Sequence, residues 1–187
     1  MTEKFFIYTV GHSNLPASKF IHLLQQAQIE LLVDVRSSPY SQYNPHFNRE
    51  VLRTRLKDAG IAYDYEGERL GGRPKDPACY KEGHLPDGKA DYLHLVDYEK
   101  VMQMDWFNDG LNRLIELAKA KRTVIMCSEE NPAHCHRHHL IARALLRNGI
   151  EVLHLRADGT VNSSHSIPPL KDDPPALQLH LFDQQVD

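Results

Sequence analysis

Short apolar runs alternate along the chain with longer stretches in which the apolar residues fall on one face of a helix. Uniformly apolar runs are typical of buried β-strands, and apolar positions spaced about 3.6 residues apart are typical of amphipathic helices. The pattern predicts strands at residues 5–10, 31–35, 61–65, 123–126 and 150–155. It predicts helices around residues 20–27, 48–59, 90–102, 106–119 and 140–145.

This order of elements predicts the fold class. Strands separated by helical stretches form βαβ units, and right-handed crossovers then give a parallel sheet with helices on both faces. We therefore expect an α/β fold, namely a Rossmann-like three-layer sandwich around a mostly parallel five-stranded sheet. Thr160 and Val161 follow an Asp-Gly turn signal and suggest a short additional edge strand.

Length and composition predict one domain with a tail. The chain has 187 residues, of which 41% are hydrophobic, and this is enough for one core. We expect residues 1–170 to form a single α/β domain. Residues 171–187 begin with Lys-Asp-Asp-Pro-Pro and are expected to form a flexible C-terminal tail.

Charge and cysteine content exclude several classes of protein. The net charge of −3 and the isoelectric point near 6.4 argue against sequence-blind coating of nucleic acid, which needs a basic surface. Three cysteines without a secretory signal predict a reducing environment and no disulfide framework. Because no apolar run reaches transmembrane length, we expect a cytoplasmic protein with no membrane partner.

The densest candidate chemistry lies in residues 122–147. Between the predicted strand and helix of this stretch stand two cysteines, four histidines and an arginine. In open α/β sheets, ligands bind beyond the carboxyl ends of the strands, near helix N-termini. All strands of a parallel sheet end on one rim, so this stretch should meet the polar residues that follow the first two strands. A long loop at residues 66–88, with Gly71 and Gly72, is expected to fold over the rim as a lid.

Individual roles follow from residue type. Cys127 is a candidate nucleophile because a helix N-terminus and nearby cations favour the thiolate, although a small buried hydrophobe is the plainer alternative. The other candidate catalytic groups are Glu129, His136 and His12. The expected substrate-binding residues are Gly11, Ser13, Asp34, Arg36, Tyr40, Gly71, Gly72, Arg73, Cys135 and Arg137. Glu130 is expected to be an exposed carboxylate, and His138 and His139 are expected on the helix surface.

The cofactor requirement stays open at this point. Cys127 and Cys135 are eight residues apart, and the tight Cys-x-x-Cys pairs typical of structural zinc are absent. A divalent metal is therefore not favoured, and no residue is assigned as a metal ligand.

The C-terminal tail carries a separate signal. Gln178, Leu179, Leu181 and Phe182 belong to a QLHLF segment that follows the acidic, Pro-containing linker. The segment resembles the short peptides through which bacterial replication and repair proteins bind the sliding clamp. A glutamine to hydrogen-bond and a Leu-Phe pair to fill an apolar pocket suit that use. Packing of the tail on its own domain is the alternative.

Four motifs resemble one known family. They are VGHSN at residues 10–14, DVRSSPYS at residues 34–41, LGGRP at residues 70–74, and C-S-E…C-H-R at residues 127–137. Together they are similar to domain-of-unknown-function family 488, a set of bacterial and archaeal proteins. The resemblance spans roughly residues 5–155 and implies an α/β fold, but no established reaction.

A second, weaker likeness is to rhodanese domains and cysteine phosphatases, where a strand ending in Asp-Val-Arg precedes one ending in a catalytic Cys. Their anion-cradling loop from Cys to Arg is shorter than the ten-residue step from Cys127 to Arg137 found here.

Three hypotheses about function remain. The first is an enzyme of DNA or nucleotide metabolism that binds an anionic, phosphate-bearing small molecule or nucleotide at the rim, with the tail recruiting it to DNA under replication or repair. The second is a rhodanese-like or phosphatase-like thiol enzyme that uses Cys127. The third is a non-catalytic module that binds a metal or a nucleotide.

Overall fold

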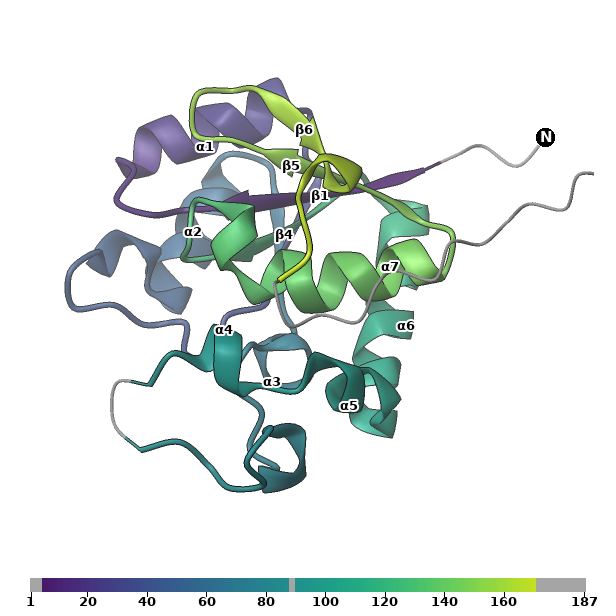
Figure 1. Ribbon diagram of the computed structural model, residues 1–187. Helices are drawn as coiled ribbons and strands as arrows, with labels where there is room; N and C mark the ends of the chain where they lie inside the picture. Colours follow the sequence, from purple (N-terminus) through teal and green to yellow (C-terminus); the bar gives the residue numbers. More distant parts are fainter. Residues whose placement is uncertain (1–4, 88–89, 171–187) are drawn as a thin grey trace, which may run out of the picture.

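The computed structural model describes residues 5–87 and 90–170, which form an α/β fold around a six-stranded sheet (Figure 1). The strand order is β3-β2-β4-β1-β5-β6. The first five strands run parallel, and β6 pairs antiparallel with β5. Their bounds are Phe6–Gly11 (β1), Leu31–Asp34 (β2), Ala62–Tyr65 (β3), Thr123–Cys127 (β4), Glu151–Leu155 (β5) and Val161–Ser163 (β6). The five predicted strands are confirmed, and the suggested edge strand extends the sheet to six.

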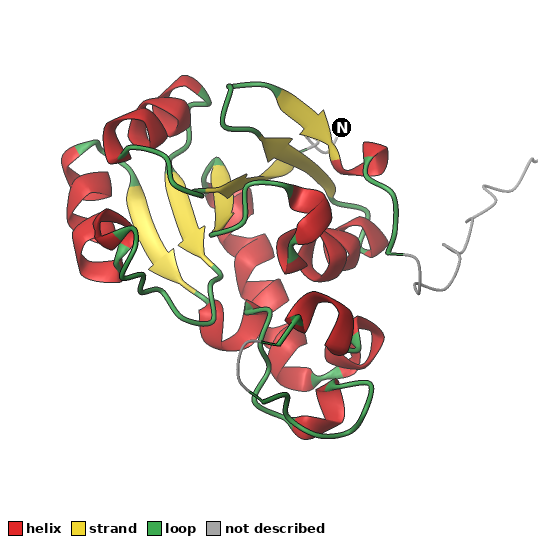
Figure 2. Cartoon of the chain, turned by 60° about the vertical axis from the view of Figure 1, so that its left-hand side comes forward, coloured by secondary structure: helices red, strands yellow, loops and turns green. Residues whose placement is uncertain are grey.

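Helices cover both faces of the sheet (Figure 2). The α-helices are Ala17–Gln26 (α1), Arg49–Asp58 (α2), Gly67–Leu70 (α3), Tyr92–Leu95 (α4), Tyr98–Gln103 (α5), Asp105–Ala120 (α6) and Arg143–Arg147 (α7). A π-helical segment, η4 (Arg137–Ala142), runs directly into α7. Short 3₁₀ turns are Pro45–Phe47 (η1), Pro77–Cys79 (η2), Pro132–His134 (η3) and Ser164–Ser166 (η5).

Two apolar cores lie on opposite faces of the sheet, because successive strand residues point to opposite sides. Ile7 and Ile125 face the core that α5, α6, η4 and α7 complete. Tyr8, which follows Ile7, and Val124, which precedes Ile125, face the core that α1 and α2 complete. The predicted three-layer sandwich is therefore present.

Residues 66–96 depart most from the sequence-based expectation. The predicted long loop contains α3 and η2, and Tyr80 forms an isolated bridge with Val96. Leu70 and Tyr80 are buried in the core, so the segment packs as part of the domain. The single helix predicted for residues 90–102 is interrupted where Val96 turns into the core, and the Asp97 side chain then caps α5 by accepting from the Lys100 amide.

Within residues 5–87 and 90–170, no helix is long and apolar enough to cross a membrane. The tail residues expected to bind a clamp, Gln178 to Phe182, lie outside the described residues.

Candidate functional site

The polar segments that follow β1 and β4 lie side by side at the rim of the sheet. Gly11 and Cys127 end their strands as parallel partners. The ladder continues past both ends, since the His12 amide donates to the Cys127 carbonyl at 3.0 Å and the Ser13 amide to the Ser128 carbonyl at 2.8 Å. A Cβ built on Gly11 would lie 1.8 Å from the Glu129 carbonyl oxygen, so only glycine permits this close approach.

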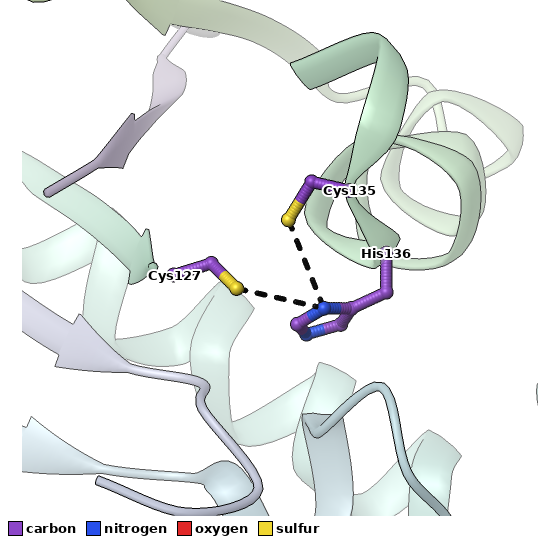
Figure 3. A group of neighbouring side chains, drawn as sticks. All are labelled: Cys127, Cys135 and His136. Carbon is purple, nitrogen blue, oxygen red and sulfur yellow. Dashed lines mark hydrogen bonds between the residues drawn. The ribbon is translucent and has the colours of Figure 1, made fainter. Parts of the chain in front are cut away.

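Cys127, Cys135 and His136 converge at this rim (Figure 3). The Nδ1 atom of His136 lies 3.7 Å from the Cys127 sulfur and 3.8 Å from the Cys135 sulfur. The three atoms all lie within 4.8 Å of one another. Their residues are only 7%, 3% and 9% exposed, respectively. Among the described residues, this is the one cluster of three or more His, Cys, Asp or Glu side chains close enough together to hold a metal ion.

The 70–74 loop forms a wall against this cluster. A Cβ on Gly72 would lie 2.6 Å from Cγ of His136, so the loop packs directly on the imidazole. A Cβ on Gly71 would lie 2.4 Å from the Ser37 hydroxyl, and that hydroxyl accepts a hydrogen bond from the Arg73 amide at 3.0 Å. Gly71 and Gly72 are thus needed for close packing between protein segments.

Arg137 is fully buried and holds the loop between Cys127 and Cys135. Its guanidinium donates to the Glu129 carbonyl, to the Glu130 carbonyl at 2.5 Å and to the Thr9 hydroxyl at 3.2 Å. All three acceptors belong to the protein. Arg137 therefore positions the loop, and it does not line the cavity described below.

The prediction that His138 and His139 lie on the helix surface is wrong. Both are buried, because η4 is buried along its whole length and has no solvent-facing side. His138 Nδ1 lies 3.1 Å from His154 Nε2, and His154 Nδ1 lies 2.6 Å from the Thr9 hydroxyl. Glu130, expected to be an exposed carboxylate, is instead partly buried in an ion pair with Arg156 at 2.8 Å.

A second polar network lies under His12. Asp34 forms a buried ion pair with Arg36, with an Nη2–Oδ2 distance of 2.6 Å. Tyr63 donates a further hydrogen bond to Asp34 at 2.9 Å. Arg36 Nη1 lies 3.2 Å from His12 Nε2, and His12 Nδ1 lies 2.8 Å from the Ser13 carbonyl. Burial chiefly lowers the pKa of His12 to about 4, so both ring nitrogens serve a neutral, fixed imidazole.

The two cysteines of the cluster differ in acidity. A hydrogen bond from Cys135 holds the pKa of Cys127 well below its usual range, and the charges of His136 and Arg137 act in the same direction. Burial, together with the adjacent Cys127, raises the pKa of Cys135 well above its usual range. The two directions differ because ionisation of one buried thiol opposes ionisation of its neighbour.

A cavity of about 750 Å³ opens over the cluster. Ten of the sequence-predicted residues line it: His12, Ser13, Arg36, Tyr40, Gly72, Arg73, Cys127, Glu129, Cys135 and His136. Gly11, Asp34, Gly71 and Arg137 lie behind this lining.

Sequence reasoning missed much of the opposite wall, which includes Ser37, Ser38, Ser41, Asn44, Tyr92 and Tyr98. The serines and the asparagine belong to a loop rich in turn-forming residues, and this composition could have marked them as candidate binding residues. Tyr92 and Tyr98 had no such signal, because they occupy helical positions typical of a core.

Comparison with known proteins yields one match. A family model described as "Domain of unknown function DUF488" matches residues 16–144. No curated protein and no solved structure matches the chain. The matched range contains the cluster, the Asp34–Arg36 pair and the Gly72 wall.

Proposed function

The chain belongs to the DUF488 family, and from its own residues we propose that it is an enzyme acting on a small phosphate-bearing metabolite of the nucleotide type. One observation carries the proposal. A polar cavity of about 750 Å³ has a buried Cys-Cys-His cluster in its wall. This volume lies within the range of small-molecule sites, and convergent reactive groups in such a cavity are typical of active sites.

The chemistry of the lining supports the ligand class. The lining includes many hydroxyl and amide side chains, and they suit the many donors and acceptors of a sugar phosphate. Tyr40, Tyr92 and Tyr98 add aromatic surface on which a base could stack. A polar ligand that contains a ring would suit such a lining.

Arg73 is the cation best placed to meet the phosphate. It is exposed on the cavity wall, its guanidinium lies 4.6 Å from the centre of the Tyr92 ring, and it makes no ion pair within the described part of the chain. Arg36 and Arg137, the other expected phosphate ligands, are already paired with Asp34 and with backbone carbonyls. We assign the main phosphate contact to Arg73 for this reason.

Catalysis would use the cluster together with Glu129. Cys127 lies at the end of a central strand beside His136, which is the arrangement of an activated thiol or of a metal ligand. Glu129 is exposed at the same wall, where a carboxylate could accept a proton. His12 is fixed and neutral, which suits a role as a hydrogen-bonding wall residue.

A thiol enzyme with Cys127 as its nucleophile is the second candidate, and the 3.7 Å contact between Cys127 and His136 favours it. Arg137, the first arginine after Cys127, is buried and donates its hydrogen bonds to backbone carbonyls. The segment from Cys127 to Arg137 therefore has no counterpart of the anion-binding loop of rhodaneses and cysteine phosphatases.

Ligand titration tests the proposed function. Adenosine monophosphate, ribose 5-phosphate and inorganic phosphate would be titrated calorimetrically into the full chain and into Arg73→Gln. Loss of a charge-assisted hydrogen bond should weaken phosphate-ester binding about tenfold or more. Arg53→Gln, an exposed arginine that does not line the cavity, is the matched control and should bind normally. Absence of binding by the folded wild type, or equal binding by Arg73→Gln, would contradict the proposal.

A further inference from the structure

We propose that Cys127, Cys135 and His136 form a three-ligand site for a divalent cation of the zinc class, with the fourth coordination position open to the cavity. The site is the reactive centre of the proposed function. Metal binding itself does not depend on the substrate being a phosphate ester, so the two proposals can fail independently.

The distances match a tetrahedral ion. With Zn–S bonds near 2.3 Å and Zn–N bonds near 2.0–2.1 Å, a tetrahedron has S···N edges of about 3.6 Å and an S···S edge of about 3.8 Å. The two observed S···Nδ1 distances are 3.7 and 3.8 Å. The sulfurs lie no more than 4.8 Å apart. The two S···Nδ1 edges thus match the values that one shared ion requires, and the upper bound on the S···S separation leaves room for an edge of about 3.8 Å.

Hydrogen bonding alone accounts for this arrangement poorly. A ring nitrogen carries at most one hydrogen, so Nδ1 of His136 cannot donate fully to both sulfurs, yet it lies almost equally far from each. The other ring nitrogen, Nε2, is buried and has no hydrogen-bond partner among the described residues. Burying an imidazole with so little compensation costs about 1–3 kcal/mol. A metal bond at Nδ1 would offset that cost.

The ligands are held by rigid surroundings. Cys127 ends β4, which lies between β1 and β2 in the sheet. Cys135 and His136 stand between the turn η3 and the π-helical segment η4. Arg137 holds the loop that precedes them by two hydrogen bonds to its carbonyls and ties it to Thr9 of β1 by a third. Gly72 packs directly against the imidazole. Such support keeps ligands in place before the ion arrives.

The donor set selects the kind of ion and its use. Two thiolates and one imidazole favour Zn²⁺ or a similar transition-metal ion over Mg²⁺ and Ca²⁺, which prefer oxygen. Three protein ligands with one open position are typical of catalytic zinc, whereas structural zinc usually has four protein ligands. All three residues line the cavity, so a substrate oxygen or a water could complete the coordination.

Cobalt titration tests the site directly. The full chain, without a polyhistidine tag, would be reduced, stripped with a chelator and titrated with Co²⁺. We expect one equivalent to bind, with the thiolate-to-cobalt absorption and visible bands of a tetrahedral complex, and Zn²⁺ to displace it. Cys127→Ser, Cys135→Ser and His136→Ala should each lower the affinity by about 100-fold or more, since each removes one of three ligands.

Cys79→Ala is the matched control, because Cys79 is also a buried free thiol but is not part of the cluster. It should bind cobalt like the wild type. Circular dichroism of each variant separates loss of a ligand from loss of folding. No uptake by the folded, reduced wild type would overturn the inference, whatever the variants do. Uptake that persists in both cysteine variants would place the ion elsewhere and overturn it as well.

The same preparations separate the two proposals. Adenosine monophosphate would be titrated into metal-free and zinc-loaded protein. Arg73-dependent binding without metal uptake would leave the proposed function standing and remove the metal site. Stoichiometric metal binding without any phosphate-ester binding would do the reverse.

Discussion

Gly72 shows how a single residue sets the geometry of the candidate site. The absence of a side chain lets the 70–74 loop pack on the His136 ring, where a Cβ would come within 2.6 Å of Cγ. Gly72→Ala should therefore displace the imidazole and cost about 1–3 kcal/mol of stability. We expect weaker cobalt binding together with a lower midpoint of urea unfolding.

Gly60→Ala is the control for that experiment. Gly60 has open space around its Cβ position but a φ of +77°, so alanine there costs stability through backbone strain alone. It should lower the unfolding midpoint and leave cobalt affinity unchanged. Equal cobalt affinity in both variants would show that Gly72 does not position His136.

The charge of Asp34 is expected to make a large contribution to the stability of the fold. It is fully buried, and the almost fully buried Arg36 depends on it as a counter-ion. Asp34→Asn keeps the shape but leaves a buried cation unpaired, which typically costs about 3–5 kcal/mol. Urea unfolding should show this loss. Glu116→Gln, which breaks the exposed pair with Lys119, should change stability by less than about 1 kcal/mol.

At the scale of elements, a buried polar chain joins β1, β5 and η4 through Thr9, His154 and His138. Burial chiefly lowers the pKa of His154 to about 3, and the neighbouring His138, His139, Arg137 and Arg156 act in the same direction. The unfolded chain would take up this proton near pH 6.5. The contribution of His154 to the free energy of unfolding is therefore fully present above pH 6.5. It decreases as the pH falls below 6.5 and stops decreasing near pH 3.

His154→Gln tests this prediction, because glutamine keeps hydrogen-bonding groups but does not titrate. The slope of unfolding free energy against pH between 6.5 and 3 should be smaller in the variant than in the wild type, whatever the absolute stability. An unchanged slope would mean that other groups govern the acid response.

The helices and strands also show which features the apolar periodicity of the sequence could not predict. The parallel strands were predictable because their residues form short runs that are apolar or alternate between apolar and polar. The split between α4 and α5 was not, because the break at Val96 and Asp97 depends on a bridge to Tyr80, which lies sixteen residues earlier in the chain. All six residues of η4 are buried, so the expected exposed helix face that placed His138 and His139 on the surface does not exist there.

At the scale of the whole molecule, a separate prediction concerns the C-terminal residues 171–187. Residues 178–182 are proposed to bind the bacterial sliding clamp, independently of the cavity. Deletion of these residues should abolish retention of the chain on immobilised clamp, while binding of adenosine monophosphate stays as in the full chain. Substituting Gln184 and Gln185, just beyond the segment, is the control and should leave retention intact. If the full chain is not retained, recruitment by this route is ruled out.

The sequence by itself determined the α/β class, the five parallel strands and the rim on which the polar motifs meet, because the alternation of strands and helices is a local pattern and right-handed crossovers place the strand ends on one rim. It also identified most residues of one cavity wall. Only the tertiary structure decided which polar groups are available for ligands. Arg36 and Arg137 carry the charges expected at a phosphate site, yet burial required protein acceptors for both. Cys127 and Cys135 lack metal-type spacing, yet folding brings both sulfurs to one imidazole, because proximity in space depends on packing between distant segments.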